Sequence, residues 1–378
     1  GKLMRFLAQY DGLTVADVEL IWKCGSNSHE SLANDALAVF FDIVGFLSHQ
    51  LVEPILKSLE SFVQNSLAAI AAIEPSQREE ATLPIQSRDL HNIATLANRL
   101  SDGPQRMKLV NLLISIVAES PVRLTAETVP HLVEIFKTEW FRPNRLTILT
   151  GLLEVLKDED SSNKSYFCSL IDPIVGTWTT DDPTTAESLK FITTFLGCPL
   201  EEFLIDELLR FKEQCRPLLT PETYGITDGL VLAGSTLYIR ELQNRLYLLY
   251  HIYFQGQGHL TTDSMLRLWD SLYQGAFNFG EAEEAAEWFK AAAADGSLAI
   301  PPTLADQLFQ ARFLTLDFQN ITPAMYCCFE RFFVYSNVVM QNMSLVTPKA
   351  GQQAPAEPEF EVSTHPDKLI GETALWDI

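Results

Sequence analysis

Cysteine and histidine are the residues in this sequence that could act as nucleophiles, general bases or metal ligands. The six cysteines are Cys24, Cys168, Cys198, Cys215, Cys327 and Cys328. None of them forms a CxxC pair, the spacing typical of a structural zinc site. On a helix the neighbouring Cys327 and Cys328 point to different faces, which makes them poor partners for one zinc ion. We therefore interpret the cysteines as buried thiols in a reducing compartment.

The motifs of nucleotide-binding and hydrolytic enzymes are absent from the sequence. It contains no GxxxxGK[ST], GxGxxG, HExxH or GxSxG. Asp158, Asp160 and Ser162 resemble the start of a calcium loop, but Ser169 stands where that loop needs a glutamate. His251 lies among aromatic residues, and we interpret it as a core or groove residue rather than a general base. We expect no catalytic residue, no cofactor and no metal ion in this chain.

Charged side chains gather in two places that could bind a partner protein. The acidic group consists of Glu281, Glu283, Glu284 and Glu287. The basic group consists of Arg99, Arg106, Lys108, Arg142 and Arg145. We interpret the acidic group as a solvated face at a helix start, with a site for a basic partner as the alternative. For the basic group, ordinary surface pairing is favoured over a groove for an acidic peptide.

The net charge and the hydropathy of the sequence limit which partners and which cellular compartment we expect. The net charge is −22, from 27 basic and 49 acidic residues, which argues against binding nucleic acid or an anionic membrane. We find neither a signal peptide nor an apolar run long enough to cross a membrane. We expect protein partners, no small-molecule ligand, and a cytoplasmic location with the nucleus as a second compartment. Because the sequence begins at Gly1 rather than Met, we expect a piece of a longer protein.

Helices are the elements that must position these residues. The predicted helices are 14–24, 30–48, 51–72, 87–101, 105–119, 126–139, 144–157, 165–179, 185–196, 200–213, 222–254 with a break near Gly234, 261–274, 281–294, 301–311 and 322–338. The helix 105–119 is apolar on two sides, so we expect it to lie between neighbouring helices. Helix pairs recur about every 35–45 residues, as in HEAT and armadillo proteins. The predicted fold is an all-α, irregular armadillo/HEAT-like helical-repeat solenoid over residues 1–344.

Capping residues and loop composition set the expected boundaries. The predicted helix starts are Thr14 with Asp17, Thr184 with Glu187, Thr303 with Asp306, and the Thr-Pro pairs at 220–221 and 322–323. Gly197 and Pro199 should end one helix. Residues 73–86 read as a loop, and the proline-rich residues 345–366 as a disordered linker or loop. A further helical segment should begin within 367–378.

Several local motifs stand in an order that resembles one family. The motifs are Ile21-Trp22-Lys23, His29-Glu30, Glu241 to Leu246, Leu268-Trp269, Trp288-Phe289, Cys328-Phe329-Glu330-Arg331-Phe332-Phe333 with Asn337, Leu369-Ile370-Gly371, and Leu375-Trp376. Together they resemble the helical-repeat region of the fat facets-type ubiquitin-specific proteases. They extend over nearly the whole chain, although residues 50–220 match mainly in hydrophobic pattern.

The resemblance implies a function for the longer protein. In that family a long helical-repeat region precedes a papain-like domain that removes ubiquitin from proteins with a catalytic cysteine. Neither the Gly/Asn-rich cysteine box nor the histidine box of that domain occurs here. The expected role is therefore a non-catalytic solenoid that binds substrates or regulators and positions a distant catalytic domain. The alternative is a helical-repeat adaptor or transport scaffold unrelated to ubiquitin.

Overall fold

A computed structural model places most of this sequence in α-helices. It describes residues 1–27, 30–74, 77, 81–157, 164–178, 183–218, 238–254, 260–293, 300–316, 321–334 and 336–337. Within these residues there is no β-strand. The chain divides into two compact units, Gly1–Ile174 and Val175–Ile378. The predicted all-α, helical-repeat fold is confirmed in both.

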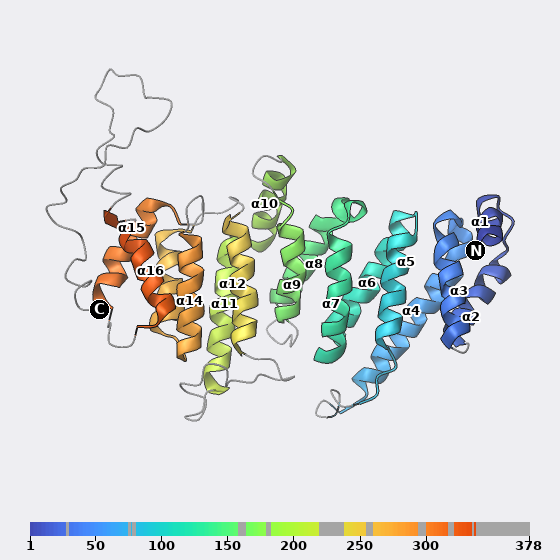
Figure 1. Ribbon diagram of the computed structural model, residues 1–378, viewed down its shortest axis with the longest axis horizontal. Coiled ribbons are helices and arrows are strands. Elements are labelled where there is room, and N and C mark those ends of the chain that lie inside the picture. Colours follow the sequence, from blue (N-terminus) through green and yellow to red (C-terminus); the bar gives the residue numbers. More distant parts are fainter. Residues whose placement is uncertain are drawn as a thin grey trace, which may run out of the picture. The chain divides into compact units, whose positions relative to one another are not determined.

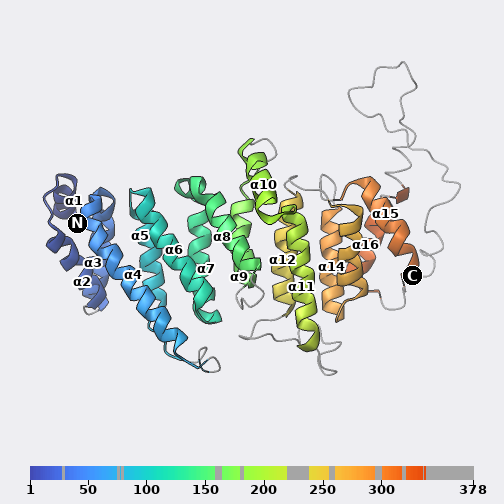
Figure 2. The same ribbon diagram turned by 180° about the vertical axis from the view of Figure 1, so that it is seen from behind.

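The helices of the first unit (Figure 1, blue to green) bury apolar side chains between them. Its helices are α1 (Lys2–Gln9), α2 (Val15–Asn27), α3 (Glu30–Ile43), α4 (His49–Ala71), α5 (Ser87–Arg99), α6 (Gly103–Glu119), α7 (Val122–Phe136), α8 (Arg145–Lys157) and α9 (Lys164–Val175). The inclined α4 in Figure 2 contacts α2 and α6. The two apolar sides of α6 lie among α4, α5 and α7, as the sequence predicted. Leu109, Leu113 and Ile116 on α6 are fully buried.

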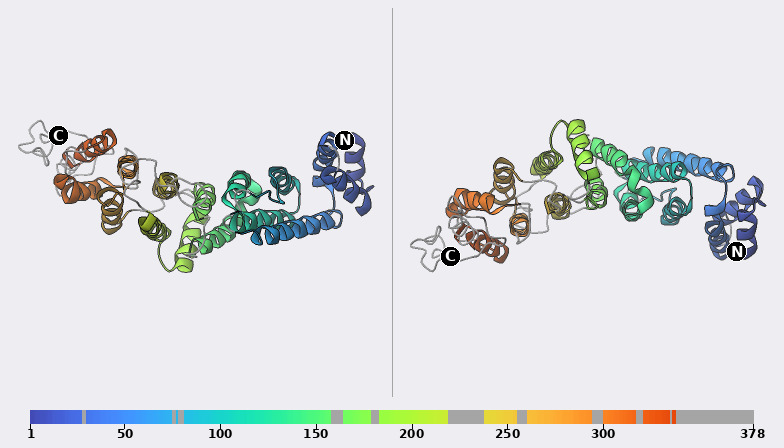
Figure 3. Two further views of the ribbon diagram at one scale, coloured as in Figure 1. Left: turned by 90° about the horizontal axis from the view of Figure 1, so that it is seen from below. Right: turned by 90° about the horizontal axis from the view of Figure 1, so that it is seen from above.

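The second unit contains the remaining described helices. They are α10 (Pro183–Leu196), α11 (Leu200–Cys215), α12 (Tyr238–Phe254), α13 (Thr262–Trp269), α14 (Phe279–Ala292), α15 (Pro302–Arg312) and α16 (Pro323–Val334). A π-helical segment, Asp270–Gln274, extends α13. Neighbouring contacts join α11 to α12 and α12 to α14. Helices α12 and α14 stand upright in Figure 1 and appear nearly end-on in Figure 3, so they run alongside each other.

The predicted caps are correct where a hydroxyl stands next to the first turn. Thr14 and Asp17 cap each other reciprocally, since the Thr14 amide donates to the Asp17 carboxylate at 2.9 Å and the Asp17 amide to the Thr14 hydroxyl at 3.3 Å. The Thr322 hydroxyl accepts from the Met325 amide at 3.3 Å. Gly197 adopts φ +81° at the end of α10, a left-handed conformation that suits glycine.

Two predicted caps are wrong, and one helix was not predicted. Helices α10 and α15 begin at Pro183 and Pro302, one residue before Thr184 and Thr303. Proline is preorganised for the first helical position, so it displaces the threonine into the helix. The unpredicted helix is α1, where Ala8 is the only buried residue of the short segment. Helix α1 ends at Gln9, before Thr14, where we predicted the start of the first helix.

Some sequence predictions fall outside the described residues. They are the break near Gly234, the linker 345–366, the segment 367–378, the acidic loop from Asp158 to Ser162, the Thr220 cap, and His29, Gly371 and Trp376. The described part of residues 73–86 contains no α-helix, in agreement with the predicted loop. None of the described helices is both long and apolar enough to cross a membrane.

Candidate functional site: a groove between α12 and α14

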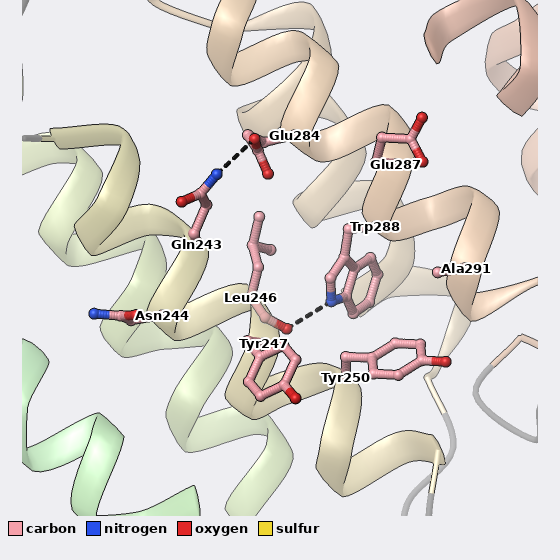
Figure 4. Close-up of a pocket in the computed structure, with 9 residues that line it drawn as sticks. All are labelled: Gln243, Asn244, Leu246, Tyr247, Tyr250, Glu284, Glu287, Trp288 and Ala291. Atoms are coloured by element: carbon pink, nitrogen blue, oxygen red, sulfur yellow. Dashed lines mark hydrogen bonds between the residues drawn. The ribbon is translucent and has the colours of Figure 1, made fainter. Parts of the chain in front are cut away.

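A groove with a volume of about 580 Å³ opens between α12 and α14 of the second unit (Figure 4). It is lined by Gln243, Asn244, Leu246, Tyr247, Tyr250, Glu284, Glu287, Trp288 and Ala291. Most of its exposed surface is apolar. Figure 4 shows the two glutamates at one end and the two tyrosines at the other. Apolar concave surfaces with a few convergent polar groups are the usual form of a binding site.

Two hydrogen bonds hold α14 against α12 at the groove. The Trp288 indole Nε1 donates to the Leu246 carbonyl at 2.7 Å, and Trp288 is buried. The Gln243 amide donates to Glu284 Oε1 at 2.7 Å. Both bonds join the two helices directly, as the dashed lines in Figure 4 mark. The floor of the groove is therefore preformed, and a partner binding there need not order it.

Buried ion pairs join α11 to the two helices that form the groove. Lys212 of α11 contacts Glu281 of α14, with side chains 1% and 0% exposed. The same ammonium donates to the Gly275 carbonyl at 2.8 Å, and the Phe277 amide donates to Glu281 Oε2 at 2.7 Å. Each buried charge thus has several partners, as a desolvated charge requires.

A second buried pair joins α11 to α12. Arg245 of α12 contacts Glu207 at 2.9 Å and Glu241 at 3.0 Å. Its guanidinium also lies over the Phe211 ring, 3.9 Å from the centroid. Together the two pairs tie α11, α12 and α14 into one packed group.

The interpretation of Glu281 as part of a solvated face is wrong. Burial raises the pKa of Glu281, and burial lowers the pKa of Lys212 despite the attraction between them. The partner of Glu281 lies on α11, so its burial depends on tertiary packing that the acidic run does not reveal. Glu283, Glu284 and Glu287 are at least partly exposed, and the latter two line the groove.

The walls of the groove are aromatic and accessible. Tyr247 is 58% exposed, and its ring centroid lies 4.4 Å from that of His251. His251 is half-buried beside the groove, which agrees with the predicted core or groove position. Tyr250 is also half-buried and lies on the same side of α12. Tyrosine at such sites offers a large rigid contact surface at low entropic cost.

The basic group of the first unit is engaged within the chain. Lys108 pairs with Glu53 at 3.1 Å, and the Arg145 guanidinium donates to the Phe136 carbonyl. Arg106 lies 4.7 Å from the centroid of the Trp140 ring and bonds the Leu100 carbonyl. These contacts favour the internal pairing that we expected over a groove for an acidic peptide.

A second hollow, of about 370 Å³, lies beside Trp22 on the first unit. Its charged lining residues already serve the fold. Arg88 donates to the Gly25 carbonyl and to Asn34 Oδ1, each at 3.3 Å. Asp89 accepts from the Gln86 amide at 3.0 Å and caps α5. The groove between α12 and α14 is therefore the stronger candidate for a partner.

Several residues that carry the family resemblance lie in the core. They include Trp269, Trp288, Cys328, Phe329, Phe332 and Asn337. The Trp269 ring stacks on Tyr273 at 4.2 Å, and Phe313 joins Trp269 to Phe332. Trp22 and Phe333 are half-buried, while Glu330 is exposed. Glu30 begins α3, with nothing described of its side chain.

Two of these motifs do contribute to the groove. Gln243, Asn244 and Leu246 come from the motif at 241–246, and Trp288 comes from Trp288-Phe289. The sequence offered each motif separately, but it did not show that α12 and α14 bring them together. The exposed tyrosines and glutamates were visible only as an aromatic-rich helix and an acidic run.

Comparison with known proteins identifies the repeat. The family model for the armadillo repeat of UBP24, USP9X and USP9Y matches residues 197–337. This segment resembles the armadillo repeat of that family. It lies wholly in the second unit and contains the groove. The predicted resemblance to fat facets-type ubiquitin-specific proteases is thereby confirmed.

Two relatives agree with the armadillo assignment over a longer stretch. The chain is 22% identical over 347 residues to the "Probable ubiquitin carboxyl-terminal hydrolase FAF" of Drosophila melanogaster. It is 21% identical over 356 residues to "Ubiquitin carboxyl-terminal hydrolase 9Y" of Mus musculus. Each alignment covers 88% of this chain. The chain spans only 12% and 13% of the length of these relatives.

Proposed function

We propose that this chain is a non-catalytic protein-recognition segment of a ubiquitin-specific cysteine protease. It binds substrates or regulators and positions the distant catalytic domain that removes ubiquitin from proteins. The observation that carries this proposal is the preformed apolar groove of Tyr247, Tyr250 and Trp288 within the armadillo segment. Armadillo-type repeats commonly expose extended surfaces for other proteins. Both relatives are named as ubiquitin carboxyl-terminal hydrolases, which favours this function over an unrelated adaptor or transport scaffold.

The chemistry of the described thiols supports a non-catalytic role. A cysteine nucleophile needs a lowered pKa and a neighbouring histidine base. Burial instead raises the pKa of Cys215 to about 11, and it raises the pKa of Cys328 further. The proposed location is the cytoplasm, with the nucleus as a second compartment.

An activity-based probe tests the non-catalytic role. The whole chain is incubated with ubiquitin vinyl sulfone, which forms a covalent adduct with the active-site cysteine of a deubiquitinase. We expect no adduct by intact-mass measurement, while a known cysteine deubiquitinase in the same buffer is labelled fully. Stoichiometric labelling of one cysteine, abolished by its change to alanine, would contradict the proposal.

A further inference from the structure

The groove between α12 and α14 combines an apolar body with an acidic end. Its apolar part consists of the aromatic rings of Tyr247, Tyr250 and Trp288, and its acidic end consists of Glu284 and Glu287. Among the described residues that line it, none is basic. Arginine and lysine have the matching character, because each carries a cationic head on an apolar stem. Aromatic faces also attract such cations.

The two carboxylates keep the capacity to receive a cation. Glu284 accepts one hydrogen bond from Gln243, and Glu287 pairs with Lys290 on its own helix at 2.5 Å. A carboxylate has about four acceptor positions, so one bond does not saturate it. The Glu287–Lys290 pair is largely exposed, with side chains 51% and 34% accessible. Exposed pairs of this kind are weak and give way readily to a better partner.

The chemistry of the groove disfavours other occupants. A purely apolar helix would desolvate Glu284 and Glu287 without supplying hydrogen bonds, which is costly. An acidic peptide would meet both carboxylates and the field of a chain with net charge −22. A basic segment instead satisfies both carboxylates and is steered toward the surface by that field.

We propose that this groove binds a basic segment of a partner protein. An arginine or lysine stem lies along Tyr247 and Trp288, and its cationic head reaches Glu284 and Glu287. The inference rests on the proposed protein-recognition function and names the chemistry of the partner.

Selection from random peptides displayed on phage tests this chemistry with the whole chain as bait. Selected peptides are synthesised, and their affinity is measured by fluorescence anisotropy. We expect the selected sequences to contain arginine or lysine beside an apolar residue. Replacing that arginine with citrulline, which keeps the shape but removes the charge, should weaken binding by about threefold to tenfold.

Five variants test whether binding occurs at the groove and whether it depends on the charge there. Tyr247→Ala should weaken binding at least about tenfold, as truncation of a central aromatic anchor does. Glu284→Gln and Glu287→Gln should each weaken it by about threefold. Glu154→Gln removes an equal charge from the exposed face of α8, and Tyr326→Ala removes an exposed tyrosine of α16. Both control variants should bind as the unchanged chain does.

The outcomes distinguish this inference from the proposed function. Peptides that need Tyr247 but are acidic or wholly apolar would overturn the basic partner and leave recognition at the groove intact. Basic peptides that bind all variants equally, Glu154→Gln included, would show attraction by net charge alone and would also overturn it. A further outcome is that peptides bind the groove variants as tightly as the unchanged chain and lose affinity only when another surface is altered. That result would exclude the groove as the binding site and leave the protein-recognition function standing. Recovery of no specific peptide would count against both.

Discussion

Two neighbouring cysteines show how helical geometry decides reactivity at the level of single residues. Cys327 is exposed and Cys328 is buried, in agreement with the prediction that they point to different faces of a helix. The interpretation of the cysteines as buried thiols is therefore wrong at Cys327. We expect iodoacetamide to alkylate Cys327 rapidly while Cys328 and Cys215 stay protected in the folded chain. At a pKa of about 11, Cys215 holds roughly a hundredfold less thiolate than an ordinary cysteine. Peptide mass spectrometry over a time course measures each rate.

The denatured chain is the control for that experiment. In denaturant all these thiols should react at similar rates, because burial no longer protects them. Labelling of Cys328 as fast as Cys327 in the native chain would contradict the orientation of α16.

The burial of the Glu281 carboxylate could not be predicted from its own helix, because its counter-ion Lys212 lies on α11. Sequence spacing within one helix cannot reveal such a partner.

The buried Lys212–Glu281 pair is the contact by which α11 and α14 hold each other at the level of elements. Lys212→Met should lower the free energy of unfolding by about 3–5 kcal/mol, since it leaves a buried carboxylate without its counter-ion. The double change Lys212→Met with Glu281→Leu should cost less than the single change, because neither charge then remains. Denaturant unfolding of the three proteins measures both differences.

An exposed pair provides the matched control for that experiment. Lys137 and Glu134 are 3.1 Å apart, with side chains 57% and 72% exposed. Lys137→Met should therefore change the free energy of unfolding by less than about 1 kcal/mol. If Lys212→Met proved as mild as Lys137→Met, the buried pair would not hold α11 to α14.

Apart from α1, the described helices were predictable from the sequence because hydrophobic periodicity is a local signal. The caps at Thr14 and Thr322 were predictable for the same reason. The helix starts at Pro183 and Pro302 were not predicted, because a proline and a threonine follow each other there and each can mark a helix start. The structure begins each helix at the proline. The groove itself could not be predicted. It exists only where α12 and α14 pack together, and the sequence contains no local signal of which helices become neighbours.

At the scale of the whole molecule, residues 197–337 match the family's armadillo repeat, and both relatives are far longer than this chain. Under the proposed function, protein recognition by the groove and catalysis by a separate domain are two parts of one protein.

The most direct test of that claim is to sequence the parent transcript on both sides of this chain. We expect a cysteine box followed by a histidine box in the same reading frame, after further helical repeats. A complete reading frame that holds repeats alone, without either box, would contradict a parent deubiquitinase and favour an adaptor or transport scaffold.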